Sequence, residues 1–299
     1  MPNSMNVVRR IGLMLSVLLI LVSTSVIVID GVKLGQDFTG GYVSEFSVMQ
    51  PISHNELKER LNDYIHSPYS LHERAHNQWQ VYQTPENGQA DVDWFEQWLA
   101  QTNAVKLDSS FLGAAAGEEL IEQGSMALLF ATLAVMFYLA VRFEWRLSLA
   151  ATLALVHDVL LTLAVLSFFD IEFTLTVLAA ILAIIGYSLN DSIVIGDKIR
   201  ELIQAQPKRK VAQLINEALA ASMSRTLITS LTTLGTIVSI WWLAGAPLRG
   251  FAITLFTGVL VGTWSSIFIS ATLPQFLGLS SQNYTRDDSE EVKRQLAEP

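Results

Sequence analysis

Apolar residues gather in six long runs that polar segments separate. A helix needs about 20 mostly apolar residues to cross the hydrocarbon core of a bilayer. The runs that approach or exceed this length cover residues 11–29, 125–141, 147–169, 173–195, 226–243 and 250–273. Charged residues make up only 16% of the chain, against about 25% in a soluble domain. The pattern predicts a polytopic α-helical membrane protein with six transmembrane helices.

The first apolar run has the features of a retained anchor. Arg9 and Arg10 precede it, as basic residues also precede a signal peptide. The run is longer than a typical signal-peptide core, and no A-x-A-like cleavage site follows it near residues 28–31. We therefore expect residues 1–30 to form the cytoplasmic N-terminus and the first transmembrane helix.

The polar segment 31–122 predicts a small α/β domain. The expected elements are a strand at 42–48, a helix from a Ser53/Glu56 capping box to about Tyr64, a strand pair within 75–82, a helix that Asp91 caps, and a strand at 105–111. The order β-α-β-β-α-β is that of a ferredoxin-like fold.

Four large apolar side chains follow one another at helical spacing in the second helix of this domain. They are Trp94, Phe95, Trp98 and Leu99. Such a cluster could grip a client polypeptide or pack against the sheet of its own domain. The i, i+4 spacing is what a core-facing helix surface needs, and it favours packing against the sheet.

Charge is distributed unevenly along the chain, whose net charge is −9. Acidic residues dominate the segment 31–122, which argues against nucleic-acid binding. Basic residues gather in the loops 142–146 and 196–221 and in the tail 274–299. Because cytoplasmic loops of membrane proteins are enriched in Lys and Arg, we expect both termini in the cytoplasm and 31–122 outside it. Residues 123–273 then hold helices 2–6.

The loop 196–221 is amphipathic on both sides of Pro207 and basic at residues 208–210. We expect a helix pair that lies in solvent or at the lipid surface, with docking of a cytoplasmic partner as the alternative. The tail 274–299 is strongly polar after Gln282 and is predicted to be disordered.

The sequence lacks the usual signatures of an enzyme. The chain has no cysteine, and neither a P-loop nor a G-x-S-x-G motif is present. Residues His72 to His76 match H-E-x-x-H, which binds zinc only when it lies on a helix with a third ligand. Neither condition is met by the surrounding sequence. We expect no enzyme activity, no metal and no cofactor.

The most informative residues are ionisable groups inside the apolar runs, because charges there are costly and usually functional. Asp191 lies in the fourth run and Arg225 at the start of the fifth, both toward the cytoplasmic side. Polar neighbours accompany them: Tyr187, Ser188, Asn190, Ser192, Thr229, Thr232, Thr233 and Thr236, with the pair His157-Asp158 in the third run. A static ion pair and a proton-carrying carboxylate are equally compatible with this pattern.

Several short motifs in order along the chain resemble those of the SecF family, the smaller half of the bacterial SecDF protein-export complex. They are Asp37-Phe-Thr-Gly-Gly41, Gly117-Glu-Glu-Leu120, His157-Asp158, Gly186-Tyr-Ser-Leu-Asn-Asp191, Ser224-Arg-Thr-Leu-Ile-Thr-Ser230, Arg249-Gly-Phe-Ala252 and Gly262-Thr-Trp-Ser-Ser266. The resemblance covers nearly the whole chain. It implies six helices that form half of an RND-superfamily transporter and pair with six helices of SecD.

The resemblance also implies a function in the bacterial cytoplasmic (inner) membrane. The partners would be SecD, the SecYEG channel, YajC and YidC, translocating preproteins that the ATPase SecA has pushed, and membrane lipids. The coupling ion would be the proton, or sodium. Asp191 and Arg225 match the proton-relay residues of the family, which act with an aspartate of SecD. Gly40 and Gly41 would allow a tight turn after the first helix. Gly258 and Gly262 would allow two helices to pack closely.

Two positions depart from the family pattern. Leu112-Gly-Ala114 stands where the family often has Val-Gly-Pro, and Gly196 stands where a bulky residue is usual. Two other functions were weighed. An RND-type half-transporter of small molecules or lipids would need more external domain than this chain has. An intramembrane aspartyl protease would need two facing aspartates, for which Asp158 and Asp191 qualify by location only.

The membrane orientation can be tested with single cysteines, because the chain has none of its own. In intact spheroplasts, an impermeant thiol reagent is expected to label a cysteine at Gln89 and not one at Gln206. The reason is the enrichment of basic residues in the loop that contains Gln206. The reverse labelling pattern would overturn the orientation.

Overall fold

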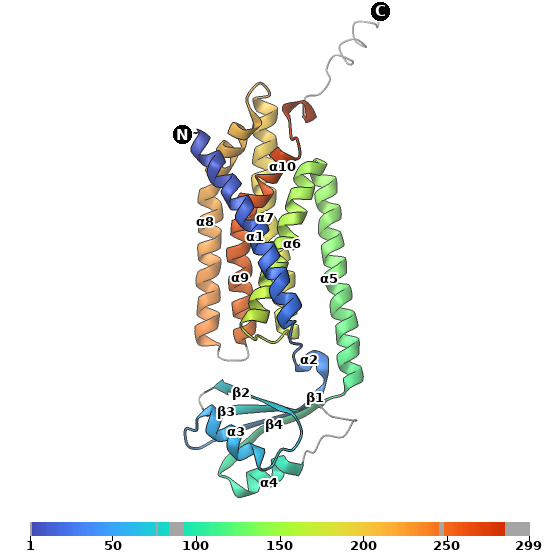
Figure 1. Ribbon diagram of the computed structural model, residues 1–299, viewed down its shortest axis with the longest axis vertical. Helices are drawn as coiled ribbons and strands as arrows, with labels where there is room; N and C mark the ends of the chain where they lie inside the picture. The colour runs from blue at the N-terminus through green and yellow to red at the C-terminus, as the bar shows by residue number, and fades with distance from the viewer. Residues whose placement is uncertain (1, 76, 84–92, 245–247, 285–299) are drawn as a thin grey trace, which may run out of the picture.

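The computed structural model describes residues 2–75, 77–83, 93–244 and 248–284. Within these ranges, a bundle of long helices lies above a small domain built on a β-sheet (Figure 1). Three sequence-based predictions fall outside the described residues: His76 of the H-E-x-x-H motif, the helix cap at Asp91, and disorder of the tail beyond residue 284. The labelling position Gln89 also lies outside them.

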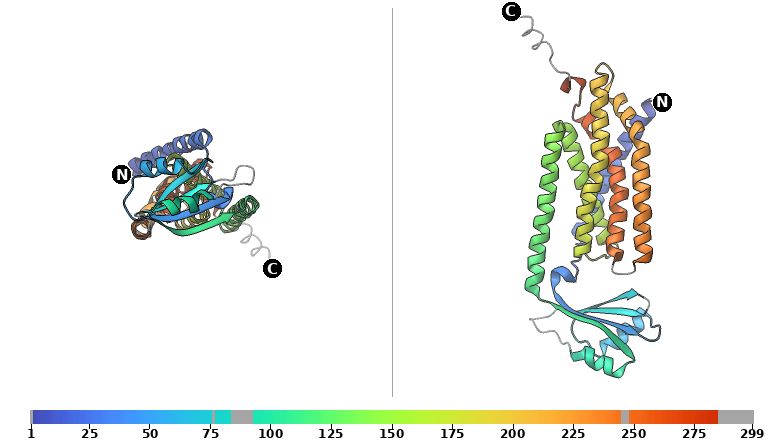
Figure 2. Two further views of the ribbon diagram at one scale, coloured as in Figure 1. Left: turned by 90° about the horizontal axis from the view of Figure 1, so that it is seen from below. Right: turned by 180° about the vertical axis from the view of Figure 1, so that it is seen from behind.

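Six helices of the described residues are long and apolar enough to cross a membrane, which confirms the six predicted spans. They are α1 (Pro2–Asp30), α5 (Ala114–Arg142), α6 (Trp145–Phe168), α7 (Leu175–Ala205), α8 (Val211–Leu243) and α9 (Arg249–Ser265), the last continued by the π-helical segment η2 (Ser266–Ser270) and α10 (Leu273–Phe276). A short 3₁₀ turn, η3 (Ser281–Asn283), follows. Helices α5 and α8 stand at opposite edges of the bundle (Figure 2), while α6 and α7 are the most buried.

The loop 196–221 differs from the expected surface helix pair. Helix α7 continues to Ala205 and α8 begins at Val211, so only a short turn joins them. The apolar sides of the two extensions face each other and form one buried cluster, which includes Leu202, Ile203, Leu214, Ile215, Ala218 and Leu219. The two apolar stripes are removed from water by packing against each other, so they need no contact with lipid. This explains why the segment is not a helix pair at the lipid surface.

The external domain is one four-stranded sheet covered on one face by two helices (Figure 1). Its elements are α2 (Gln36–Thr39), β1 (Gly41–Val48), α3 (His54–Asn62), β2 (Tyr69–Ala75), β3 (Gln78–Gln83), α4 (Asp93–Gln101) and β4 (Ala104–Leu112). The strand order is β2-β3-β1-β4, and every neighbouring pair is antiparallel. The predicted strand pair begins earlier than expected, at Tyr69, and turns at Asn77, whose φ of 64° suits asparagine.

The aromatic side chains of α4 pack on the sheet of their own domain, as predicted. Trp94, Phe95 and Trp98 are buried in one cluster with Phe46 of β1, and the rings of Phe46 and Trp98 lie 4.5 Å apart. Aromatic pairs at this separation add to the free energy gained from burial alone. The cluster therefore forms the core of the domain and is not available to a client.

An arginine without an acidic partner among the described residues ties together the end of the bundle far from the external domain. Arg9 of α1 is only 2% exposed. Its guanidinium donates to Asn216 Oδ1 at 2.7 Å, Thr272 Oγ1 at 3.1 Å and Gln275 Oε1 at 3.1 Å. The side chain thus joins α1 to α8 and to the segment around α10. Its basic character predicted the orientation of the chain, but nothing in the sequence indicated its burial.

Arg9→Met should destabilise the bundle, because it leaves two buried acceptors and one half-buried acceptor without their donor. An unsatisfied buried polar group costs about 1–3 kcal/mol. Arg10→Met is the matched control, since Arg10 is exposed and lies over the ring of Phe276. Thermal unfolding in detergent should show a clearly lower Tm for Arg9→Met and little change for Arg10→Met. Equal Tm values would mean that the Arg9 contacts contribute nothing.

Candidate functional site

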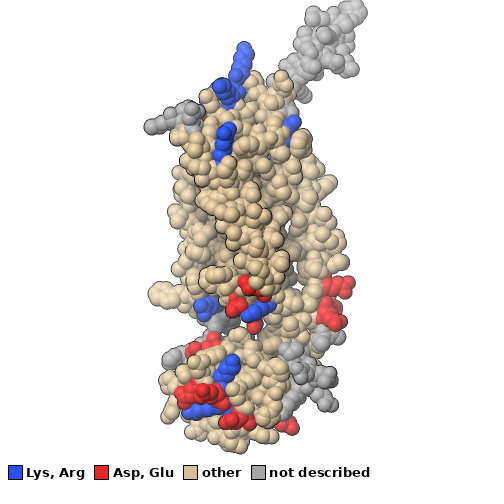
Figure 3. All heavy atoms as spheres, viewed as in Figure 1, with Lys and Arg blue, Asp and Glu red and all other residues tan. Residues whose placement is uncertain are grey.

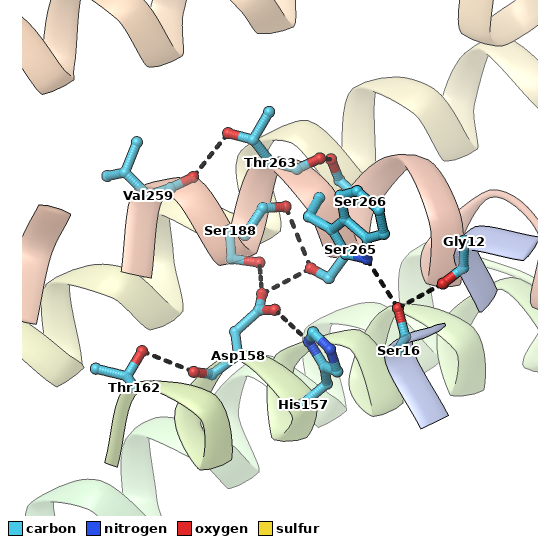
Figure 4. Close-up of polar contacts among 12 residues, drawn as sticks. Gly12, Ser16, His157, Asp158, Thr162, Ser188, Val259, Thr263, Ser265 and Ser266 are labelled. Carbon is cyan, nitrogen blue, oxygen red and sulfur yellow. Dashed lines mark hydrogen bonds and ion pairs between the residues drawn. The ribbon is translucent and has the colours of Figure 1, made fainter. Parts of the chain in front are cut away.

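A fully buried carboxylate lies at the centre of the bundle, where α6, α7 and α9 meet (Figure 4). Asp158 is 0% exposed. Its Oδ2 accepts from Ser188 Oγ of α7 at 2.5 Å and from Ser265 Oγ of α9 at 2.8 Å. Its Oδ1 lies 3.0 Å from Nδ1 of the adjacent His157. These partners satisfy a group that would otherwise be very costly in an apolar surrounding.

His157 contributes one satisfied and one unsatisfied nitrogen to this network. Its Nδ1 faces Asp158, whereas its Nε2 is buried and lacks a hydrogen-bond partner among the described residues. The described residues hold no group of three or more His, Asp, Glu or Cys side chains placed to bind a metal ion. The network is therefore built from neighbouring hydroxyls and one imidazole.

Glycines of α9 allow the helices to approach closely enough for these bonds. A Cβ on Gly262 would lie 3.2 Å from Cβ of Ser188 and 3.5 Å from Oδ2 of Asp158. A Cβ on Gly258 would lie 2.2 Å from Cδ1 of Ile184 on α7. The prediction that these two glycines form a close-packing face is confirmed. Sequence reasoning did not name Ser265 as a site residue, although it follows Gly262 within a quoted motif.

A second set of hydroxyl contacts connects α7, α8 and α9 next to the Asp158 network. Tyr187 donates to Ser230 Oγ at 3.3 Å, and Ser230 Oγ lies 2.7 Å from Thr263 Oγ1. Tyr187 was named as a supporting polar residue from sequence, whereas Ser230 and Thr263 were not. All three side chains lie at contacts between helices, where interhelical hydrogen bonds stabilise membrane bundles.

Asp191 lies one turn beyond Ser188 on α7 and faces α8. It is 3% exposed, and its Oδ2 has no hydrogen-bond partner among the described residues. The hydroxyl of Thr226 on α8 lies near this carboxylate but forms no hydrogen bond of normal geometry with the described residues. Thr226 was not named from sequence. Unlike Asp158, this carboxylate is buried without a complete set of donors.

Arg225 does not form an ion pair with Asp191, although the two side chains are near each other. The two charges interact electrostatically, but the ion pairs within the described part of the chain do not include this one. The side chain of Arg225 is exposed at the edge of the bundle, and Asn190 is exposed as well. The cation is therefore available to a group outside this chain.

The threonines near Arg225 bond to their own helix. Thr229 Oγ1 donates to the carbonyl of Arg225 at 3.0 Å, and Thr233 Oγ1 donates to that of Thr229 at 2.8 Å. Thr232 and Thr236 do the same on the exposed side. Such bonds satisfy a hydroxyl inside the membrane without a partner helix. The polar stripe thus lies along the outer face of α8.

The motif Asp37, Gly40 and Gly41 lies far from Asp191, between the helices and the external domain (Figure 1). Gly40 has φ 66° and Gly41 has φ 142°, conformations that favour glycine. A Cβ on Gly41 would lie 2.4 Å from the carbonyl oxygen of Gln83 on β3. Asp37 accepts a hydrogen bond from the backbone N–H of Leu175 at 2.8 Å.

Comparisons with known proteins find relatives that match about nine-tenths of the chain. The family described as "Protein export membrane protein SecD/SecF, C-terminal" matches residues 95–280. The chain is 34% identical to the protein translocase subunit SecF of Escherichia coli O157:H7 over 90% of this chain and 86% of that protein. The same subunit of Pseudomonas aeruginosa is 34% identical over 92% of both chains. This chain belongs to the SecF family.

A solved structure of a family member has the same arrangement of helices and domain. The crystal structure of SecDF, a translocon-associated membrane protein from Thermus thermophilus, matches with a TM-score of 0.82 and 31% identity. The match covers 90% of this chain and 38% of that chain. The present chain therefore corresponds to a part of SecDF.

The two departures from the SecF family pattern lie at opposite ends of α5. A Cβ on Gly196 would lie 3.3 Å from the ring of Phe143, so an aromatic ring from the α5–α6 turn occupies the space beside this glycine. Ala114, which stands where the family often has proline, is the first residue of α5, and Gly113 before it has an extended conformation. In both places the backbone continues without distortion.

Gly262→Ala should disturb the Asp158 network, because its methyl group would press on Ser188. Gly235→Ala is the matched control, since a Cβ there meets nothing within 4 Å. Alanine in open space favours a helix over glycine by about 1 kcal/mol. Thermal unfolding in detergent should show a lower Tm for Gly262→Ala and an equal or higher one for Gly235→Ala. A Tm for Gly262→Ala at or above wild type would contradict the close approach of α9.

Proposed function

We propose that this chain is the SecF subunit of the Sec protein translocase, an accessory membrane protein and not an enzyme. It acts with SecD in the bacterial cytoplasmic membrane and helps to pull preproteins out of the SecYEG channel, with YajC and YidC as further partners. Proton entry, or sodium entry, supplies the energy. Membership of the SecF family and the six apolar helices support this function.

The fold we propose is half of an RND-type transporter with a ferredoxin-like external domain. The strand order β2-β3-β1-β4, with one helix between β1 and β2 and another between β3 and β4, supports the ferredoxin-like assignment. The likeness to SecDF, of which this chain matches 38%, supports a second set of helices contributed by SecD.

The proposed orientation has both termini in the cytoplasm. On the face seen in Figure 3, charged residues occupy the two ends of the molecule and leave an uncharged belt between them. Arg142, Arg146 and Arg200 belong to the end opposite the external domain, and basic residues favour the cytoplasmic side. The external domain then lies on the outer side of the membrane, where exported chains emerge.

The carboxylate of Asp191 is the proposed ion carrier. It is buried beside Thr226 with one oxygen lacking a hydrogen-bond donor among the described residues. A neutral carboxyl is the stable form in such a place when no cation is near, and a carboxylate is stable when one approaches. Arg225 lies within electrostatic reach on the next helix. Protonation and release of a proton would therefore alter how α7 and α8 attract each other.

Two exposed surfaces suit SecD as the partner. Arg225 and the threonine stripe lie on the outer face of α8, where an isolated cation in lipid would be costly. In the external domain, β4 is an edge strand of the described sheet and is exposed from Val105 to Phe111. An exposed edge of this length readily pairs with another strand.

The alternative function is that of an RND-type half-transporter for small molecules or lipids. The external domain offers little room for a ligand, because aromatic side chains fill the space between its sheet and helices. The family membership of the chain favours protein export over small-molecule transport.

Asp191→Asn should abolish coupling without preventing assembly. The asparagine keeps the shape of the protonated carboxyl but cannot change its charge. We expect Asp191→Asn to accumulate, to bind SecD and to lose export stimulation and ion flux to background. Arg225→Met should fail in the same way, and the double variant should be no worse than either single one. Pulse-labelled preprotein export in cells, together with ion uptake by the reconstituted complex, measures both.

Asp197→Asn is the matched control for this experiment. Asp197 lies on the same helix and pairs with Arg142 at the end of the bundle, where both side chains are partly exposed. Removal of this charge should leave export and ion flux close to wild type. Normal export by Asp191→Asn, or a defect explained entirely by loss of the protein, would show that Asp191 is structural.

A further inference from the structure

The short helix α2 lies between the external domain and the membrane helices and contacts both. On the membrane side, the segment before α2 pairs with the α6–α7 loop as in a parallel sheet, at Leu34 and Phe173. Gly35 N–H donates to the carbonyl of Phe173 at 2.9 Å, and Phe173 N–H donates to the carbonyl of Lys33 at 2.7 Å. The rings of Phe38 and Phe173 are 5.7 Å apart, and Phe38 is buried.

Asp37 extends this contact to the first turn of α7. Its Oδ2 accepts from the backbone N–H of Leu175 at 2.8 Å, while the side chain of Thr174, the N-cap residue of α7, accepts from the backbone N–H of Val177. The first N–H groups of a helix have no partner within it and carry partial positive charge. The Asp37 carboxylate therefore binds the N-terminal end of α7. Ser188 and Asp191 lie further along the same helix.

On the other side, α2 is attached to the sheet of the external domain. Thr39 Oγ1 lies 2.6 Å from the hydroxyl of Tyr82, which also bonds to the carbonyl oxygen of Gly40. Gln80 donates to Gln36 at 3.3 Å. Both sheet residues belong to β3. The helix α2 is thus attached to α7 through Asp37 and to the sheet through Gln36, Thr39 and Gly40.

The covalent connections of the domain lead to other helices. The chain enters the domain from α1 through Gly31, which has φ 71° and open space around it, and it leaves the domain into α5. Neither α1 nor α5 carries a residue of the network around Asp158 and Asp191. The exposed ion pair Lys33–Asp170 and the exposed contact between His72 and Glu172 lie at the same level, but exposed pairs of this kind contribute little free energy.

We propose that Asp37 is a positioning residue that couples the external domain to α7, so that a movement of α7 driven at Asp191 reaches the domain through α2. The coupling rests on the proposed function in protein export. Asp37 itself binds no ion in this arrangement. It acts as a tether, together with the Leu34–Phe173 bridge, and its removal should separate ion movement from export.

Substitutions at Asp37 test the tether in the complex with SecD. Asp37→Ala removes the acceptor for Leu175 N–H and should lower preprotein export by about fivefold, which corresponds to the ~1 kcal/mol that a side-chain hydrogen bond to a helix N-terminus typically contributes, while ion uptake by the reconstituted complex continues. Asp37→Asn keeps an acceptor oxygen and should export close to wild type. Asp30→Ala, an exposed aspartate at the end of α1, is the matched control and should behave as wild type.

A disulfide can replace the tether. Facing residues of adjacent strands lie about 4.8 Å apart, within the range that a disulfide spans, and the chain has no other cysteine. Leu34→Cys with Phe173→Cys should restore export to Asp37→Ala when oxidised and lose it again when reduced. This rescue also excludes poor folding as the cause of the defect. A cysteine-free preprotein serves as the export substrate.

Wild type and Asp191→Asn belong in the same assay. If wild type neither stimulates export nor conducts ions, the proposed function fails and the coupling role falls with it. If wild type and Asp191→Asn behave as expected, the coupling role alone is overturned by any of three results. These are normal export by Asp37→Ala, equal failure of Asp37→Asn and Asp37→Ala, and no rescue by the oxidised disulfide.

Discussion

Hydrocarbon gives a polar side chain no partner, and most of this structure follows from that constraint. Asp158 can be buried at the centre of the bundle because three side chains bond to it: His157 from its own helix, Ser188 from α7 and Ser265 from α9. Their convergence in turn requires that α9 approach α7 at Gly262 without a side chain between them. The helix core is thus organised around a polar group and not only around apolar packing.

Three buried ionisable side chains meet this constraint in different ways. Asp158 has hydrogen-bond partners on both oxygens, and Arg9 has neutral acceptors on α8 and in the α10 segment. Asp191 has neither a full set of donors nor a closed ion pair among the described residues. A satisfied group contributes to a single stable arrangement. A group whose hydrogen bonds or ion pair are complete only after its charge or its neighbour changes favours two conformations of the helices. An ion-driven transport protein requires two such conformations.

The predictable parts of the molecule are those that one segment determines alone. Apolar run length was sufficient for six spans, and aromatic spacing was sufficient for the core of the external domain. The partners Ser265 and Thr226 could not be derived in this way, because serine and threonine are common in membrane helices and usually bond to their own backbone. The burial of Arg9 and the pairing of the α7 and α8 extensions depend on contacts between segments distant in sequence, which periodicity does not report.

The π-helical segment η2 lies between the two buried polar networks on one continuous stretch of chain. Ser265, before it, reaches Asp158, and Thr272 and Gln275, after it, reach Arg9. Each residue of a regular helix advances the side-chain direction by about 100°. Loss of one residue within 266–270 would turn everything beyond it by about that angle and direct Thr272 and Gln275 away from Arg9. The length of this segment, more than the identity of its side chains, is therefore what keeps the two networks in register.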